Sequence, residues 1–379
     1  MSHDFVRRLP LDSFARSSFG RLGQRFHIDM VLMLLLTVTC AYGLLVLDSA
    51  VNRDSASVIS QLMKLGVAML IMIIMAQIPP VFYLRIAPWL YLGGLAMLVM
   101  VLFFGYKVNG STRWLRIPGV ISFQPSEVMK LFVPMILAWY FHDRHLPPKA
   151  KHVFWAAAMI ALPVVLIGVQ PDLGTGLLIC ASGLLVLLLS GIQWRYVFGV
   201  LGFACLSAPA LWFVMRDYQR QRVLTLFNPE SDPLGAGWNI IQSKTAIGSG
   251  GLYGKGLYQG TQSHLDFLPE SHTDFIIAVL AEELGLIGIL VLLLLYLLIT
   301  GRGLVMAVQA QDTFGRLLSG SIVFTFFVYV FVNIGMVSGI LPVVGVPLPL
   351  VSYGGTSIMT LFAGFGLLMS IHAHRRISL

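Results

Sequence analysis

Long apolar runs constrain this chain more than any other feature of its sequence. A helix needs about 20 consecutive apolar residues to cross a bilayer, and its backbone groups must then pair within the helix itself. Ten such runs can be read along the chain, the fourth of them marginal: 29–47, 58–78, 86–104, 128–142, 153–170, 173–190, 196–214, 275–298, 318–340 and 355–372. The runs lack the alternation that marks a membrane β-barrel. We therefore predict an all-α polytopic membrane protein with about ten transmembrane helices.

Composition supports this class and explains the basic charge. The chain is 57% hydrophobic and 11% charged, whereas soluble domains carry roughly 25% charged residues. The net charge is +8, but the basic residues of the short connections gather on one side of the predicted membrane. The positive-inside rule then places both termini in the cytoplasm, with residues 1–28 as a cytoplasmic segment. The charge is thus an orientation signal, and no nucleic-acid partner is expected.

The topology predicts one transmembrane domain, residues 29–379, whose chemistry belongs to its outer face. Three outer segments, at about 105–127, 215–274 and 341–355, hold most of the polar and glycine-rich sequence. Loops as long as the second, which joins the seventh and eighth helices, are usually functional or disordered. Because this loop keeps many apolar residues, we expect it to be ordered.

Several ionisable residues lie inside or at the edge of the predicted spans. They are Glu127, Lys130, Asp172, Glu282 and Glu283. Each costs roughly 2.5–3.5 kcal/mol if it faces lipid. Such costs imply a shared polar cavity or pairing, and Lys130 and Asp172 are candidate partners.

The stretch FLPESHTDF (267–275) places Glu270, His272 and Asp274 on alternate positions before the eighth helix. Asp274 could cap that helix, because a carboxylate is favoured at a helix N-terminus. It could also be catalytic; the residues alone favour capping but leave both roles open. His272 could simply bond loop backbone.

Cations on the outer loops also have two interpretations. Arg113, Trp114 and Lys130 suit an anionic headgroup that bears sugars, although a tryptophan there is also typical of the interfacial belt. Arg220 and Arg222 fit a solvated face equally well. The stretch GSGGLYGKG resembles a phosphate loop but lacks the strand–loop–helix frame, so turn chemistry is the better interpretation.

Two functional classes remain at this point: a transporter with a midplane site, and an enzyme that acts on a lipid-borne substrate at the outer leaflet. Transporters usually show related halves, and no convincing internal repeat is visible. The elaborate outer loop favours an enzyme.

Five motifs carry a resemblance to a known family: FQPSE (123–127), QPDLGT (170–175), GWNIIQSKTAIGSGGLYGKG (237–256), FLPESHTDF, and GILPVVGVPLPLVSYGG (339–355). Together they resemble the SEDS family, whose members polymerise peptidoglycan from lipid II. The likeness runs from the first helix to the last, and it is nearer to the rod-shape, elongation branch than to the division branch. It implies a ten-helix fold in the bacterial inner membrane with an active site that faces the periplasm.

The resemblance also assigns site residues. Asp274 matches the family's functional aspartate, which makes it the candidate general base. Arg113, Lys130 and Asp172 match polar positions of the family's central cavity. The mechanism that the family implies needs cations against a leaving pyrophosphate, and Lys244, Arg220 and Arg222 stand behind Arg113 and Lys130 as candidates. Glu127, Glu270 and His272 are supporting candidates.

One position departs from the family's pattern. Members often carry arginine before a glutamine near the start of the second helix, where this chain has Ser60-Gln61 with Lys64 one turn later. Lys64 could supply the missing cation.

Cofactors and partners follow from the resemblance alone. A divalent cation, Mg²⁺ or Mn²⁺, could share the pyrophosphate charge, but no carboxylate cage specifies one. Expected partners are lipid II, the nascent glycan strand, a class B penicillin-binding protein that acts as transpeptidase, and other elongasome membrane proteins. The alternative function is a lipid II flippase.

Overall fold

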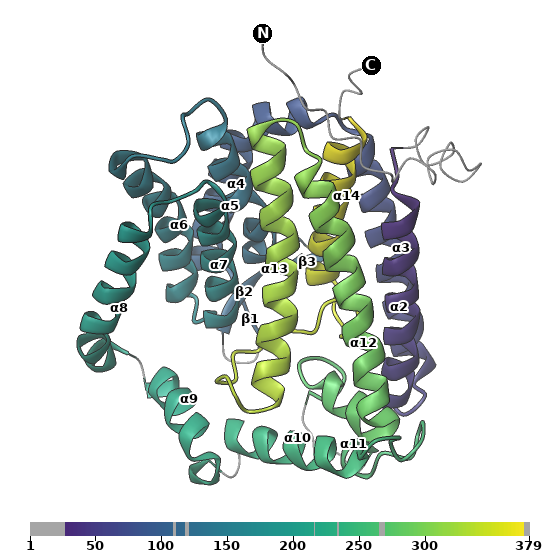
Figure 1. Ribbon diagram of the computed structural model, residues 1–379. Helices are drawn as coiled ribbons and strands as arrows, with labels where there is room; N and C mark the ends of the chain where they lie inside the picture. Colours follow the sequence, from purple (N-terminus) through teal and green to yellow (C-terminus); the bar gives the residue numbers. More distant parts are fainter. Residues whose placement is uncertain are drawn as a thin grey trace.

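The structure is a computed structural model that describes residues 27–108, 111–117, 121–215, 217–232, 235–264 and 270–374. Each predicted apolar run coincides with a helix: α2 (Met30–Ala50), α3 (Ser55–Gln77), α4 (Pro80–Phe104), α5 (Pro125–His142), α6 (Ala150–Val169), α7 (Leu173–Leu189), α8 (Trp194–Val214), α12 (Ile276–Val308), α13 (Thr313–Val337) and α14 (Thr356–Ala373). These helices form one bundle with α13 near its centre (Figure 1). The rings of His27 and His374 stack at 4.6 Å, so the described chain begins and ends at the same end of the bundle.

Seven of the described helices are long and apolar enough to cross a membrane: α2, α3, α4, α6, α12, α13 and α14. The apolar parts of α7 and α8, Gly174–Leu189 and Trp194–Ser207, are shorter. Helix α5, the marginal fourth run, carries Glu127 and Lys130 and has most of its residues buried. Because it packs against protein rather than lipid, it does not need a continuous apolar surface.

Aspartates begin several of the helices at the positions where the apolar runs start. Asp29 accepts a hydrogen bond from the Leu32 amide at 2.8 Å, and Asp54 accepts from the first turn of α3. Asp312 does the same for α13. These side chains satisfy amides that have no partner within the helix, so the helix starts follow from local sequence.

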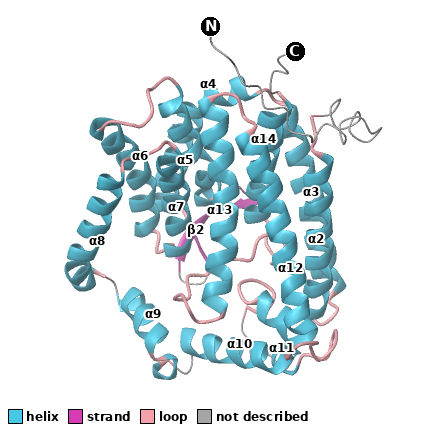
Figure 2. Cartoon of the chain, viewed as in Figure 1, coloured by secondary structure: helices cyan, strands magenta, loops and turns pink. Residues whose placement is uncertain are grey.

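The first outer segment forms a small antiparallel sheet that the sequence analysis did not anticipate. Its strands β1 (Tyr106–Val108), β2 (Ser111–Ile117) and β3 (Ile121–Phe123) lie in the order β1-β2-β3. Figure 2 shows how little strand there is beside the helices. The sheet matters here because β2 carries Arg113 and Trp114.

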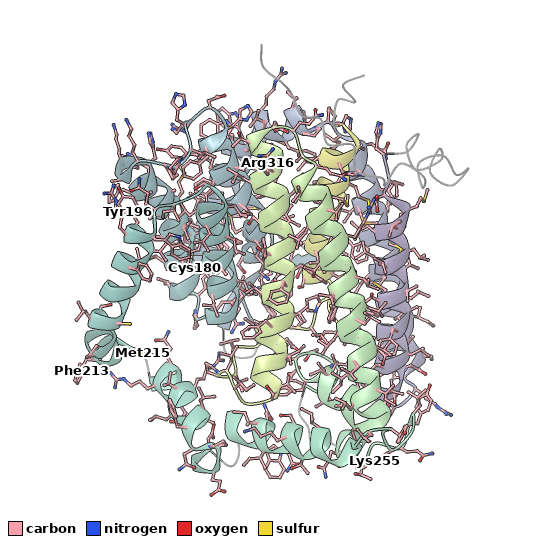
Figure 3. The ribbon with its side chains drawn as sticks, viewed as in Figure 1. Cys180, Tyr196, Phe213, Met215, Lys255 and Arg316 are labelled. Carbon is pink, nitrogen blue, oxygen red and sulfur yellow. The ribbon has the colours of Figure 1, made fainter. Side chains whose placement is uncertain are left out.

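The long outer loop is ordered over its described residues, as predicted. It contains α9 (Asp217–Phe227), the 3-10 turn η2 (Pro229–Ser231), α10 (Ala236–Gly250) and α11 (Thr261–His264). Helices α9 to α11 lie across one end of the bundle (Figure 1). Figure 3 places Lys255, which follows α10, at that end and Arg316 at the other. The basic N-terminal residues 1–26 and the last residues, 375–379, on which the orientation prediction partly depends, are outside the described residues.

Helix α12 is interrupted near its start, and the glycine-rich residues 250–256 hydrogen-bond to the backbone groups that the interruption leaves unpaired. Gly285 has a φ of +66° and a ψ of −162°, which interrupts the helical hydrogen bonds. The amides of Lys255 and Gly256 donate to the carbonyls of Glu282 and Glu283, both at 3.0 Å, while the Leu286 amide donates to Gly251 at 3.0 Å. Backbone inside a membrane protein must be paired in this way. Residues 250–256 therefore have a structural role in supporting α12, as the turn interpretation of GSGGLYGKG predicted.

Candidate functional site

Asp274 lies in a tight turn at 270–275, the Asp274 turn, just before α12. Glu270 has a φ of +57°, and its carbonyl accepts from the amides of Thr273 and Phe275 at 3.1 and 3.3 Å. The N-cap residue of α12 is Phe275, and no side chain caps the helix. The capping role that the sequence allowed for Asp274 is therefore wrong, and the carboxylate is available for chemistry.

Buried polar groups from two other segments hold the Asp274 turn. The Asn333 side chain, fully buried in α13, donates to the carbonyls of Asp274 at 2.8 Å and Val346 at 2.7 Å. The Ser352 hydroxyl donates to the Thr273 carbonyl at 2.5 Å. Val346 and Ser352 belong to the segment between α13 and α14, residues 338–355, which we call the proline-rich loop. This loop and α13 thus fix the backbone that carries Asp274.

The carboxylate of Asp274 is half-buried and lies against the proline-rich loop. A side-chain carbon added at Gly345 would come within 3.3 Å of Asp274 Oδ2. The pKa of Asp274 is raised to about 6: burial raises it most, the negative charge of Glu270 adds to the rise, and the positive charges of Arg113 and Arg222 oppose it. Desolvation disfavours the charged form of any carboxyl group. At neutral pH the Asp274 carboxylate is therefore mostly ionised, yet it is a stronger base than an ordinary aspartate. A general base requires both properties.

Arg113 connects the small sheet to the start of α7. Its guanidinium lies 3.6 Å from the Asp172 carboxylate and donates to the Pro171 carbonyl at 3.3 Å. Asp172 also accepts from the Gln124 side chain at 2.8 Å and from the Thr175 amide. The predicted Lys130–Asp172 pair is therefore wrong, because Arg113 and Gln124 occupy the Asp172 carboxylate.

Lys130 instead pairs within its own helix. Its ammonium lies 2.6 Å from Glu127 Oε1 and contacts the Tyr329 hydroxyl of α13. An i,i+3 spacing puts the two charges on one helix face, a closer partner than α7 could offer. Both side chains are almost fully buried.

A cavity of about 40 Å³ adjoins this pair. Helices α5, α13 and α14 line it. A volume of this kind exceeds the roughly 10–15 Å³ that one water needs, so the cavity has room for water beside the pair. Most of its lining is apolar, and Asp172, Glu282 and Glu283 lie outside it. Of the two alternatives that the intramembrane charges left open, pairing is therefore the one observed, through Arg113–Asp172, Lys130–Glu127 and Lys255–Glu282.

Lys64 contacts the end of the proline-rich loop. Its ammonium lies 3.8 Å from the ring centroid of Tyr353, and the Tyr353 hydroxyl lies 3.3 Å from the Ser60 hydroxyl. The hydrogen bond from Lys64 lowers the pKa of Tyr353. The Tyr353 ring packs edge-on against His272 at 5.9 Å. His272 is thus a packing partner, and its carbonyl accepts from the Tyr353 amide.

The remaining predicted residues lie at the same end of the molecule with less connection to Asp274. Arg220 donates to the Phe213 carbonyl at 2.8 Å and so ties α9 to the end of α8. Lys244 is exposed on α10, with its stem against Gly339. Trp114 follows Arg113 on β2, and adjacent strand residues face opposite sides of a sheet. Their roles in substrate binding stay predictions.

Glu282 and Glu283 serve the structure of α12 rather than the site. Glu282 is fully buried and pairs with Lys255 at 2.7 Å, while Glu283 accepts from Ser49 of α2 at 2.6 Å. Among the residues that the structure describes, no group of three or more His, Cys, Asp or Glu could hold a metal ion. The divalent cation that the sequence left possible is not tested by this finding.

Sequence reasoning missed the residues that hold the site. Asn333 is a single amide within an apolar run, and such a residue inside a span is a functional candidate by default; that signal was available. Gln124, Ser352 and Tyr353 lie within the motifs FQPSE and GILPVVGVPLPLVSYGG. Their particular roles could not be predicted, because these roles depend on contacts between distant segments.

Comparisons with known proteins identify the family of the chain. The family described as cell cycle protein, which comprises FtsW, RodA and SpoVE, matches residues 25–377. The chain is 52% identical over 353 residues to the peptidoglycan glycosyltransferase MrdB of Escherichia coli (strain K12), a match that covers 93% of this chain and 95% of that protein. It is 41% identical over 282 residues to the probable peptidoglycan glycosyltransferase FtsW of Geobacter metallireducens, covering 73% and 74%.

Solved structures are similar as well. A chain from a peptidoglycan synthase complex, solved to describe the structural coordination of polymerization and crosslinking, aligns with a TM-score of 0.81 at 30% identity over 92% of this chain and 99% of its own length. The rod shape determining protein RodA of Thermus thermophilus aligns with a TM-score of 0.70 at 28% identity over 92% and 97%.

Proposed function

The chain belongs to the FtsW/RodA/SpoVE family of multi-pass membrane proteins, and from this premise we propose that it is a peptidoglycan glycosyltransferase of the rod-shape type, with Asp274 as its general base. The family that the sequence motifs resembled is thereby confirmed. The observation that carries the proposal is the Asp274 carboxylate itself. It caps no helix, its pKa is raised to about 6, and the charges of Arg113 and Arg222 reach it.

The reaction joins two lipid-linked saccharides. The 4-hydroxyl of an N-acetylglucosamine on lipid II attacks the anomeric carbon of the growing strand, the new C–O bond forms, and the bond to undecaprenyl pyrophosphate breaks. A sugar hydroxyl is a poor nucleophile, so a carboxylate within about 2.6–3.2 Å must accept its proton as attack proceeds. Attack from the face opposite the leaving group inverts the anomeric centre and gives the β-1,4 link.

The leaving pyrophosphate accumulates negative charge and needs fixed cations nearby. Arg113 and Arg222 are the cations whose charges reach Asp274, so they are best placed to stabilise a leaving group at the same reaction centre. The Asp172 carboxylate and the Pro171 carbonyl hold the Arg113 guanidinium in place. Such preorganised charge acts more strongly in a site shielded from water than in solution. Lys130, which is buried with Glu127, is expected to affect binding indirectly.

Orientation and partners complete the proposal. The site lies at the end of the bundle that α9 to α11 cover, away from His27 and His374. With cytoplasmic termini in the inner membrane, this end faces the periplasm, where lipid II carries its sugars. Because a similar chain was solved within a peptidoglycan synthase complex, we further propose a class B penicillin-binding protein as the crosslinking partner, within a larger elongasome.

The test is polymer formation from purified lipid II by the reconstituted protein. The wild type should make glycan strands, and Asp274→Asn, which keeps the size of the side chain, should insert normally and make none. Glu230→Gln is the matched control, because Glu230 is an exposed carboxylate on the same outer loop; this variant should polymerise normally. A flippase would instead move labelled lipid II across the vesicle membrane without polymer, and that result would exclude the proposed activity.

A further inference from the structure

Lys64 is a half-buried cation that the proposed chemistry does not use. It lies in α3, within a membrane-spanning segment, where an ammonium group is costly unless it is paired or functional. Among the described residues it forms no ion pair with a carboxylate. Its contacts are the Tyr353 ring at 3.8 Å and a hydrogen bond to the Tyr353 hydroxyl. A lysine ammonium has three donors, so donors remain for a further acceptor.

The surroundings of Lys64 are built rather than incidental. Tyr353 is held by its amide bond to the His272 carbonyl at 2.9 Å. Gln61, buried one turn before Lys64, accepts from the Gly354 amide at 3.2 Å and donates to the Ser352 carbonyl at 3.3 Å. The Ser60 hydroxyl reaches the Tyr353 hydroxyl at 3.3 Å. Lysine, tyrosine and serine donors thus converge where α3 meets the proline-rich loop.

The position of this cluster relative to Asp274 has a chemical meaning. The positive charges of Arg113 and Arg222 act on the Asp274 carboxyl. Lys64 lies over the Tyr353 ring, and that ring also contacts His272, a residue of the Asp274 turn. Among the described residues, the site therefore has one cationic group whose charges act on the general base and a second, on α3, that contacts the Asp274 turn only through Tyr353.

The reaction needs two pyrophosphates at different distances from the base. The donor's pyrophosphate leaves from the carbon under attack, so it must lie beside the reaction centre. The acceptor keeps its pyrophosphate, which is attached to the far end of the disaccharide whose near end carries the attacking hydroxyl. One cation site beside Asp274 and another displaced from it match these two requirements.

Building on the proposed function, we propose that Lys64, with the hydroxyls of Tyr353 and Ser60, binds the pyrophosphate of the acceptor lipid II, while Arg113 and Arg222 bind the pyrophosphate of the donor strand. The assignment orients both substrates. The acceptor enters along α3 and the proline-rich loop, and the donor lies toward β2 and α9.

A binding experiment tests the assignment without catalysis. Undecaprenyl pyrophosphate is titrated into Asp274→Asn protein in nanodiscs, and the bound equivalents are counted by native mass spectrometry. Two equivalents are expected for Asp274→Asn alone and one after Lys64→Gln is added. Lys64→Arg should keep two, and so should Lys151→Gln, which removes an exposed lysine of α6. Two equivalents retained by the Lys64→Gln protein would overturn the proposal.

Kinetics in the active protein give a second readout. Lys64→Gln should raise the KM for lipid II by about tenfold or more, the usual effect of losing one charge-assisted contact. The rate at saturating lipid II should stay within about threefold of the wild type. A lower saturated rate with unchanged KM would contradict the acceptor role. Polymer made by Asp274→Asn would refute the general base instead, so the two failures are distinguishable.

Discussion

Because the pKa of Asp274 is raised, the polymerisation rate should fall with acidification near pH 6, well above the range in which an ordinary aspartate titrates. Asp274 accepts a proton only in its ionised form, so the rate should follow the ionised fraction. Its pKa is about 6, against 3.8 for an ordinary aspartate. About 91% of the carboxyl groups are then ionised at pH 7 and about 9% at pH 5, which predicts a roughly tenfold fall in rate between these values. An ordinary aspartate would leave the rate almost unchanged over the same interval.

Removing the charge of Glu270 should shift this fall in rate at low pH, the acid limb of the pH profile. Its carboxylate raises the pKa of Asp274 after burial has done so. Glu270→Gln removes that charge while it keeps an acceptor for the Thr273 hydroxyl, which donates to Glu270 at 2.8 Å. The acid limb should therefore shift to lower pH, and the variant should be more active than the wild type at pH 5 relative to pH 7.

The assay is the initial rate of strand formation at saturating lipid II from pH 5 to pH 8. Samples held at pH 5 and returned to pH 7 must recover full rate, so that unfolding is excluded. A wild-type rate that is flat between pH 7 and pH 5 would refute the reasoning. The same conclusion would follow from an acid limb that Glu270→Gln moves to higher pH.

Three further predictions concern stability and positioning. The pKa of Asp274 is higher in the folded chain than in the unfolded chain, so the folded chain binds a proton more tightly and its stability falls as pH rises from about 4 to 6. Asp274→Asn should therefore increase the free energy of unfolding by up to about 3 kcal/mol at pH 7, seen as a higher unfolding temperature. Gly285→Ala should lower the unfolding temperature or abolish folding, because φ at this residue is +66° and the added carbon would lie 2.3 Å from the Gly254 amide nitrogen. Gly301→Ala is the control: it lies in the same helix, its added carbon meets open space, and it should be neutral. Asn333→Leu should lower the saturated rate roughly tenfold to a hundredfold at unchanged KM, because it releases the Asp274 carbonyl; an unchanged rate would show that the turn is held by other contacts.

The membrane helices were predictable because hydropathy and helix starts are local properties. Asp29, Asp54 and Asp312 each precede an apolar run and cap the helix that follows. Even the marginal fourth run is a helix, α5, and its charges explain why it looked weak. The three-stranded sheet was not predicted, because its strands are short and lie in a segment rich in glycine and charge.

The site was predictable only where a residue's role is visible in its own motif. Asp274 was identified from the motif before the eighth helix. Its alternative role as a helix cap could be excluded only from the structure, in which Phe275 is the N-cap residue. The Lys130–Asp172 pair failed because two nearer partners, Glu127 and Arg113, compete for the same charges. Contacts such as that between Asn333 and the Asp274 carbonyl join residues 59 positions apart, which no local pattern encodes.

The most direct test of the general base is the turnover of lipid II by Asp274→Asn at pH 7 and saturating substrate. Loss of a general base costs roughly 10²–10⁴-fold in rate, so the variant should polymerise at no more than about one hundredth of the wild-type rate, with lipid II still bound. A rate within tenfold of the wild type, from a protein shown to be folded, would contradict the account.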